Sequence, residues 1–248
     1  MNIILGTIWG GNFDEYKLFF ESMDLVDSPE TCPIIFVDDM KGIPPPGVLF
    51  IPFKRSDRIH PNCQRFMLYF EFLKMNRMAD RVLLTDCRDV YFLGDPFFPS
   101  LPNGLHVFLE DNRMDIGSCQ FNREWVKRVW GSANAERLSN KPISCAGVTI
   151  GDYQSMIEYL ESMAWNCDDL VNALVNVDQG IHNGLVYLDK LNNCIIHDND
   201  SGPVLTMGYM QNPSPSKLGK YAIIHQYDRH PEFKAYLEKL HEHSRNGG

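Results

Sequence analysis

The chain has 248 residues, and its content of 44% hydrophobic and 12% aromatic residues supports a sizeable core and excludes a disordered chain. The formal net charge of −9 argues against a nucleic-acid partner, because no basic stripe is present to neutralise a phosphate backbone. No apolar run reaches the roughly 20 residues of a membrane span, so we expect no membrane span.

Seven cysteines are scattered along the chain without a CxxC or Cys/His zinc spacing. The sequence therefore supports neither a disulfide framework nor a structural zinc site. Reduced thiols are the simpler interpretation, and the N-terminal sequence MNIILGTIWGG enters a strand at once, without a basic and apolar leader. We expect a cytoplasmic protein.

Short apolar runs alternate with amphipathic stretches through the first 110 residues. The pattern predicts strands over 2–8, 33–37, 48–53, 82–84 and 106–109, with helices over 13–26 and 63–78. Such alternation of strands and helices favours a mostly parallel sheet.

The second part of the chain is less regular. Strands are expected over 146–150, 194–197 and 221–225, and helices over 123–130, 153–163, 168–177 and 231–243. Asp178-Gln179-Gly180 is expected to end the helix over 168–177. A loop rich in Gly, Pro and Ser over 207–220 is long enough to act as a lid. No shift in composition marks a domain boundary, so we expect a single domain.

One stretch, residues 81–98, joins a buried strand to a cluster of charges. Its apolar run ends in Asp86-Cys87-Arg88-Asp89. Two carboxylates at the carboxyl end of a buried strand are costly unless a cation lies between them, and open α/β sheets bind their ligands at that end. Because hard divalent cations take oxygen ligands, the stretch indicates a metal ion that holds the phosphates of a nucleotide. The alternative is a turn whose aspartates cap a short helix and pair with Arg88.

Six further segments place small or polar residues at the ends of expected strands and helices. They are Gly6-Thr7, Asp38, Arg65, Ala146-Gly147, Asp178-Gln179 and His225. Each has an ordinary structural alternative as a packing site, a turn former, a solvated charge or a buried histidine. None of these segments is specific alone.

The order of these segments from Gly6 to His225, which spans nearly the whole chain, resembles that of glycosyltransferases of the GT-A fold. This resemblance implies an α/β, GT-A-like fold with a mostly parallel central sheet flanked by helices. It also implies one domain over 1–248, with a nucleotide-binding half over about 1–110 and an acceptor-binding half over about 111–248. The usual motif of that fold is Asp-x-Asp, whereas this chain has one more residue between Asp86 and Asp89.

The resemblance implies a metal site and a donor site, built mainly from the first half with His225 from the second. Asp86, Asp89 and His225 would bind Mn²⁺ or Mg²⁺ against the diphosphate of a UDP- or GDP-sugar. The nucleoside would be seated by Gly6, Thr7 and Asp38, with Arg65 and Arg88 near the phosphates.

The resemblance also implies a reacting centre in the second half. Ala146 and Gly147 would bring backbone close to the donor sugar. Asp178, beside Gln179, would act as a general base on a glycan or glycoconjugate acceptor, or position the donor in a retaining mechanism.

Two other functions remain open at this point. A Mg²⁺-dependent phosphohydrolase would need a nucleophilic aspartate after the first strand, where the chain has Gly6-Thr7-Ile8-Trp9. A non-catalytic module that binds a nucleotide-sugar or a glycan would keep the fold without the chemistry. An oxidoreductase of the dinucleotide-binding type is disfavoured, because no GxGxxG follows any expected strand.

Overall fold

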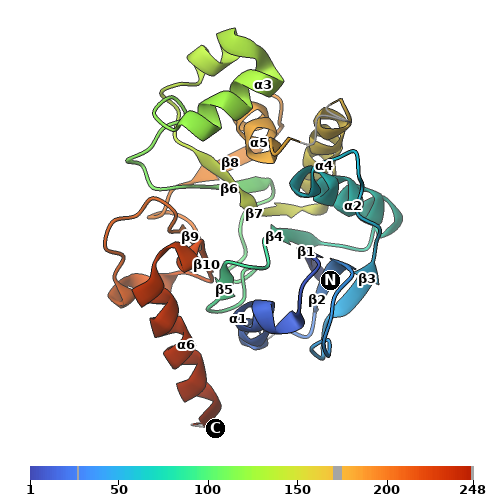
Figure 1. The fold of residues 1–248 in the computed structure, drawn as a ribbon, viewed down its shortest axis with the longest axis vertical. Helices are drawn as coiled ribbons and strands as arrows, with labels where there is room; N and C mark the ends of the chain where they lie inside the picture. Colours follow the sequence, from blue (N-terminus) through green and yellow to red (C-terminus); the bar gives the residue numbers. More distant parts are fainter. Residues whose placement is uncertain (27, 170–174, 247–248) are drawn as a thin grey trace.

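A mixed sheet of seven strands, mostly parallel, forms the centre of the molecule, with helices on both faces (Figure 1). The computed structural model describes residues 1–26, 28–169 and 175–246, and for residues 215–217 and 241–246 it describes the backbone alone. The strand order is β3-β2-β1-β4-β7-β6-β8. Strand β7 runs antiparallel to both of its neighbours, β4 and β6. The expected α/β class and mostly parallel sheet are confirmed.

The first half of the chain builds the parallel part of this sheet. Its strands are β1 (Asn2–Trp9), β2 (Thr31–Asp38), β3 (Leu49–Pro52) and β4 (Arg81–Thr85). Strands β1 and β2 are joined by two 3-10 helices, η1 (Phe13–Tyr16) and η2 (Met23–Leu25), that flank α1 (Lys17–Ser22). The order reverses between β1 and β4, because β2 lies on one side of β1 and β4 on the other.

Helix α2 (Pro61–Met75) connects β3 to β4. The His60 side chain caps its first turn, and Pro61 provides the fixed φ angle that suits a first helical position. Buried Phe66, Tyr69 and Leu73 recur at helical spacing and turn one face of α2 toward the sheet.

The rest of the chain adds the strands β6 (Leu105–Leu109), β7 (Ser144–Asp152) and β8 (Cys194–His197). Its helices are α3 (Gln120–Arg137), α4 (Tyr153–Asp168) and α5 (Asp178–Tyr187), and α3 is kinked at Gly131. The expected helix over 168–177 is not found where the structure can test it. Residues 170–174 lie outside the described residues, residues 175–177 are not helical, and Asp178 begins α5. The prediction that Asp178-Gln179-Gly180 ends a helix is therefore wrong.

A second, smaller sheet has the order β5-β10-β9. It contains β5 (Val90–Phe92), β9 (Val204–Thr206) and β10 (Ile223–His225). The loop expected over 207–220 includes a 3-10 helix, η3 (Pro215–Lys220), and is followed by η4 (Tyr227–Arg229) and α6 (Pro231–Asn246).

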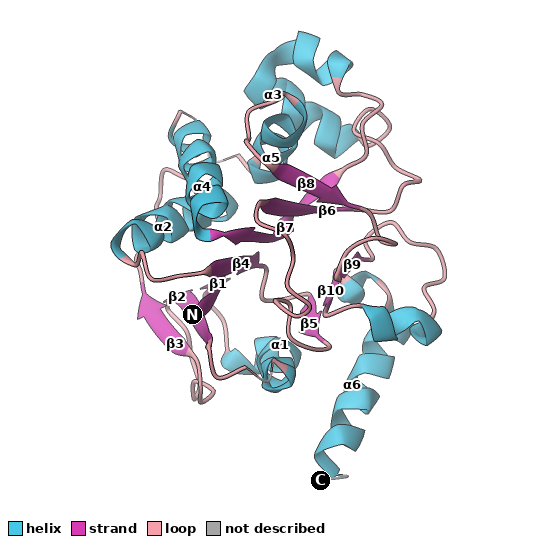
Figure 2. Ribbon diagram, turned by 180° about the vertical axis from the view of Figure 1, so that it is seen from behind, coloured by secondary structure: helices cyan, strands magenta, loops and turns pink. Residues whose placement is uncertain are grey.

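Two apolar cores cover the two faces of the large sheet. Along β1, Ile3 and Leu5 pack with α2 and α4, while Ile4 and Ile8 pack with α1 and the small sheet. This alternation follows from the period of two in a strand. Figure 2 shows α2 and α4 on the side opposite α1 and β5. Among the described residues, no helix is both long and apolar enough to cross a bilayer.

Candidate metal centre

Strand pairing brings His225 to the two aspartates of the segment Asp86-Cys87-Arg88-Asp89. Asp86 and Asp89 lie in the turn between β4 and β5. Strand β10 pairs antiparallel with β5 and places His225 opposite Val90, the residue that follows Asp89. The backbone N–H of Gln226 donates to the Asp89 carbonyl at 2.8 Å and fixes this register.

The three side chains converge on one point. His225 Nε2 lies 3.5 Å from Asp86 Oδ2 and 3.6 Å from Asp89 Oδ1. One potential ligand atom from each residue lies within 4.8 Å of the other two. Two carboxylate oxygens and one imidazole nitrogen form a donor set that suits Mn²⁺ or Mg²⁺.

The surroundings of His225 leave its Nε2 atom without a hydrogen bond to any described residue, although the side chain is only 1% exposed. Burial lowers the pKa of His225, but the nearby Cys145, Asp89 and Asp86 outweigh burial and raise it well above its ordinary value. A buried nitrogen that faces two carboxylates in this way favours a positive charge between them. The site therefore fits a cation.

Gly147 of β7 leaves the space in which these groups meet. A Cβ atom at this position would lie 2.3 Å from His225 Cε1 and 2.6 Å from Asp86 Oδ2. Strand β7 is fixed beside β4, where the Asp86 N–H donates to the Gly147 carbonyl at 2.7 Å. Since no side chain fits at 147, the small residue expected here has a steric cause.

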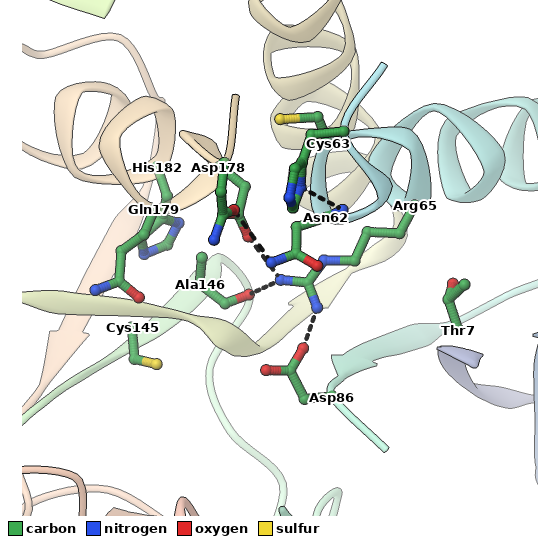
Figure 3. A network of polar contacts seen from close by, with 12 residues as sticks. Thr7, Asn62, Cys63, Arg65, Asp86, Cys145, Ala146, Asp178, Gln179 and His182 are labelled. Atoms are coloured by element: carbon green, nitrogen blue, oxygen red, sulfur yellow. Dashed lines mark hydrogen bonds and ion pairs between the residues drawn. The ribbon is translucent and has the colours of Figure 1, made fainter. Parts of the chain in front are cut away.

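Arg65 lies between two acids rather than at an open surface (Figure 3). Its Nη1 atom forms an ion pair with Asp86 Oδ1, and its Nη2 atom lies 2.9 Å from Asp178 Oδ2 and 3.4 Å from the Ala146 carbonyl oxygen. Burial raises the pKa of Asp86, but Arg65 and His225 outweigh it and hold the pKa well below its usual range. The guanidinium group thus joins a residue of the candidate metal site to Asp178.

The start of α5 carries Asp178 and Gln179 at the same edge of the sheet. Asp178 is 6% exposed. Burial raises the pKa of its carboxyl group, Arg65 lowers it and the charge of Asp86 raises it, and the net result is a pKa above the ordinary value. Gln179 Nε2 donates to Glu110 Oε1 at 3.2 Å and to Asn122 Oδ1 at 2.9 Å. In Figure 3 both side chains lie at the end of α5 nearest Ala146.

Asp38 occupies a separate position at the end of β2. Its carboxylate accepts a hydrogen bond from the Gly10 N–H and a second, of 2.7 Å, from Arg55 Nε. The Arg55 guanidinium also lies over the Trp9 ring, 5.7 Å from its centroid. Arg55 and Trp9 therefore belong to this strand-end group, although the sequence pattern did not select them.

Gly6 and Thr7 make packing contacts. The Thr7 hydroxyl donates to the Tyr69 hydroxyl at 2.8 Å in a buried hydrogen bond. A Cβ atom at Gly6 would lie 2.5 Å from Cys87 Sγ and 2.8 Å from a methyl group of Ile35. Figure 3 shows Thr7 apart from the residues gathered around Arg65. The structure does not bring either residue to the metal centre.

Arg88 has an exposed side chain that lines a cavity of about 560 Å³ together with residues of α1 and α6. The Tyr227 hydroxyl donates to the Arg88 carbonyl at 3.3 Å and ties the turn of the aspartates to the segment after β10.

Four residues that the sequence did not single out complete the site: Glu110, Asn122, Cys145 and Gln226. Glu110 offered one signal, since it follows β6, which runs parallel to β4 and ends at the same edge. The other three are recognised only by their contacts.

Comparison of the chain with protein-family models and with curated proteins finds no match.

Proposed function

We propose that the protein is a metal-dependent glycosyltransferase with a GT-A-like fold. It would transfer a sugar from a nucleoside-diphosphate sugar, a UDP- or GDP-sugar, to a hydroxyl group of a glycan or glycoconjugate. The observation that carries this proposal is the meeting of Asp86, Asp89 and His225 in space left by Gly147, around an imidazole nitrogen that has no hydrogen bond within the described part of the chain.

The strand order supports a nucleotide at this edge. The chain progresses from β1 to β2 and β3 in one direction and to β4 in the other, so the order reverses between β1 and β4. Open α/β sheets bind ligands in the crevice outside the carboxyl ends of their strands at such a reversal. Asp38 and Asp86, which end or follow strands on the two sides of β1, would border the nucleotide.

Asp86, Asp89 and His225 would hold the ion, and its charge would stabilise the negative charge that develops on the departing diphosphate. Arg88 and Arg229 are exposed cations on the two segments that carry these ligands, and they would supply positive charge for the phosphates. Arg65 would have a different role, because its guanidinium group already forms ion pairs with Asp86 and Asp178. It would position these two acids.

Asp178 and Gln179 would contact the sugar undergoing transfer. Arg65 holds the Asp178 carboxylate in place, and Glu110 and Asn122 hold the Gln179 amide. These contacts orient both side chains before substrate arrives, so little side-chain freedom would be lost on binding.

A phosphohydrolase with an aspartate nucleophile is the weaker alternative, because β1 ends in Ile8-Trp9 and offers no carboxylate beside Asp86. A binding module without turnover is separated from a transferase by experiment.

The test is a thermal-shift panel of nucleoside diphosphates and nucleotide-sugars, each with and without Mn²⁺. We expect stabilisation by one base class that requires the metal, since a ligand bound at 100 times its Kd stabilises a protein by about 2.7 kcal/mol. Absence of any metal-dependent shift across the panel would refute the proposal. A donor that binds but is neither hydrolysed nor transferred in a full acceptor screen would identify a binding module.

Asp178→Asn separates binding from transfer. The variant keeps the side-chain volume and should bind donor and metal as the natural protein does, while losing transfer. Donor affinity from calorimetry and transfer rate are the two measurements, and Glu161→Gln, at an exposed acid of α4, is the control. A full transfer rate would remove Asp178 from the mechanism.

A further inference from the structure

Cys145 lies against the side of the His225 ring that faces away from the two aspartates. Its Sγ atom is 3.6 Å from His225 Nδ1, and Gln226 Nε2 donates to the same sulfur at 3.6 Å. The side chain is buried, as are those of His225 and Gln226. A thiol in contact with a histidine of the candidate centre has no part in the function proposed above.

We propose that Cys145 is a positioning residue of the metal centre: its sulfur accepts a hydrogen bond from His225 Nδ1–H, so that the lone pair of Nε2 faces Asp86 and Asp89. This inference rests on the proposed function, because it assumes that the three residues bind a metal. A neutral imidazole carries one ring proton, and the hydrogen bond at one nitrogen decides which nitrogen is free for a metal.

A second neighbour of Cys145, Gln226, supports an accepting role for the sulfur. The amide nitrogen of Gln226 can only donate, so the sulfur already accepts one hydrogen bond. A sulfur atom can accept more than one hydrogen bond, so it can also accept from His225 Nδ1–H, 3.6 Å away.

The course of β7 explains the placement. Cys145 and Gly147 lie where the pairing of β7 with β6 shifts register, and both approach the ring of His225. Gly147 leaves room for Cε1 and Nε2 of the ring, while Cys145 contacts Nδ1. The segment Ser144–Asp152 therefore supplies both the space for the histidine and its support.

The experiment measures Mn²⁺ binding to the full chain without nucleotide, by calorimetry and by the electron paramagnetic resonance signal of free Mn²⁺. Cys145→Ala should weaken binding roughly 10- to 100-fold, the usual effect of losing a partner of a metal ligand. Cys145→Ser should remain within about threefold of the natural protein, because a hydroxyl group keeps the donor and acceptor roles. Cys167→Ala, at another buried thiol, is the matched control and should leave the affinity unchanged.

Each outcome bears on the inference. Equal affinity in the natural protein and Cys145→Ala would overturn it while leaving the metal centre intact, and so would a Cys145→Ser variant as weak as Cys145→Ala. Failure of the natural protein to bind Mn²⁺ would overturn the metal centre as well.

A measurement without substitution covers the case in which Cys145→Ala does not fold. Nitrogen-15 shifts of His225 in the Mg²⁺-loaded natural protein should place the ring proton on Nδ1. A proton on Nε2 would overturn the inference.

Discussion

Two histidines, His182 and His225, are buried to the same degree but have opposite surroundings. His182 Nε2 lies 2.8 Å from Ser144 Oγ, and its Nδ1 lies 2.8 Å from the Tyr159 hydroxyl. His225 has a weak partner at Nδ1, the Cys145 sulfur, and its Nε2 atom lies 3.5 and 3.6 Å from two carboxylate oxygens. Burial lowers the pKa of His182 to about 3, whereas the surroundings of His225 raise its pKa.

The difference shows that burial alone does not identify a ligand-binding histidine. A buried polar atom is stable when its hydrogen bonds are made within the fold, and both nitrogens of His182 meet this condition. His225 does not, because Nε2 gains a partner only from a proton or a cation. The unsatisfied nitrogen therefore separates a candidate metal ligand from a structural histidine.

Arg65 extends the comparison to a buried cation whose charge is balanced by two carboxylates, those of Asp86 and Asp178. Arg65→Met would leave Asp178 buried without a counter-charge, and we expect a loss of about 3–5 kcal/mol in the free energy of unfolding. Urea denaturation at pH 7 with a chelator present measures this loss.

The matched control for Arg65 is the double variant Arg65→Met, Asp178→Asn, which removes both charges and should recover part of the stability. Exposed ion pairs contribute up to about 1 kcal/mol to stability. If Arg65→Met lowers the free energy of unfolding by less than this, then the Asp178 carboxylate is better solvated than its contacts indicate.

Asp89→Asn tests the surroundings of His225, whose Nε2 atom faces two carboxylates. It removes one of the two carboxylates that face His225 Nε2 and should weaken Mn²⁺ binding by more than about 100-fold, beyond the usual effect of an outer partner. The melting temperature without metal should change little. Calorimetry with Mn²⁺ checks the affinity, with His182→Gln as the control that should still bind. Unchanged affinity in Asp89→Asn would exclude this residue as a ligand.

His182 gives a dependence of stability on pH. The unfolded chain takes up a proton at this residue near pH 6.5, but the folded chain resists it until about pH 3. Stability is therefore lost as the pH falls through this window, by about 2 kcal/mol between pH 6.5 and 5. His182→Gln should be less stable at pH 7.5 but should lack this part of the decline. Denaturation curves of the two proteins from pH 7.5 to 5 make the comparison, and parallel declines would contradict the assignment.

The strands of the first half could be predicted because each is a short apolar run between polar turns. The start of α5 could not. Gly180 looks like a helix breaker, but a Cβ atom there would lie 2.6 Å from the Trp125 backbone, and Trp130 Nε1 donates to its carbonyl at 3.0 Å. The glycine is required by the close packing of α3 on α5. Local sequence carries no signal of that contact.

The same limit applies to the site. Asp86 and Asp89 were identified because they follow a buried strand, and His225 because of its place in the order of motifs. Cys145 and Gln226 could not be identified, because their roles depend on contacts with each other and with the ring of His225. Residue type and position along a strand predict a charged cluster. The contacts that support the cluster can be seen only in the folded chain.

Thr7 offers the smallest effect and the finest distinction between a structural and a ligand-binding residue. The resemblance implied contact with the nucleoside, but its hydroxyl donates to Tyr69 in the core. Thr7→Val keeps the shape and removes this hydrogen bond, so we expect a loss of about 1 kcal/mol in the free energy of unfolding. Nucleoside-diphosphate affinity should not change, whereas Asp38→Asn should weaken it. A drop in affinity for Thr7→Val comparable to that for Asp38→Asn would return Thr7 to the binding site, and would show that full hydrogen bonding does not always mark a structural residue.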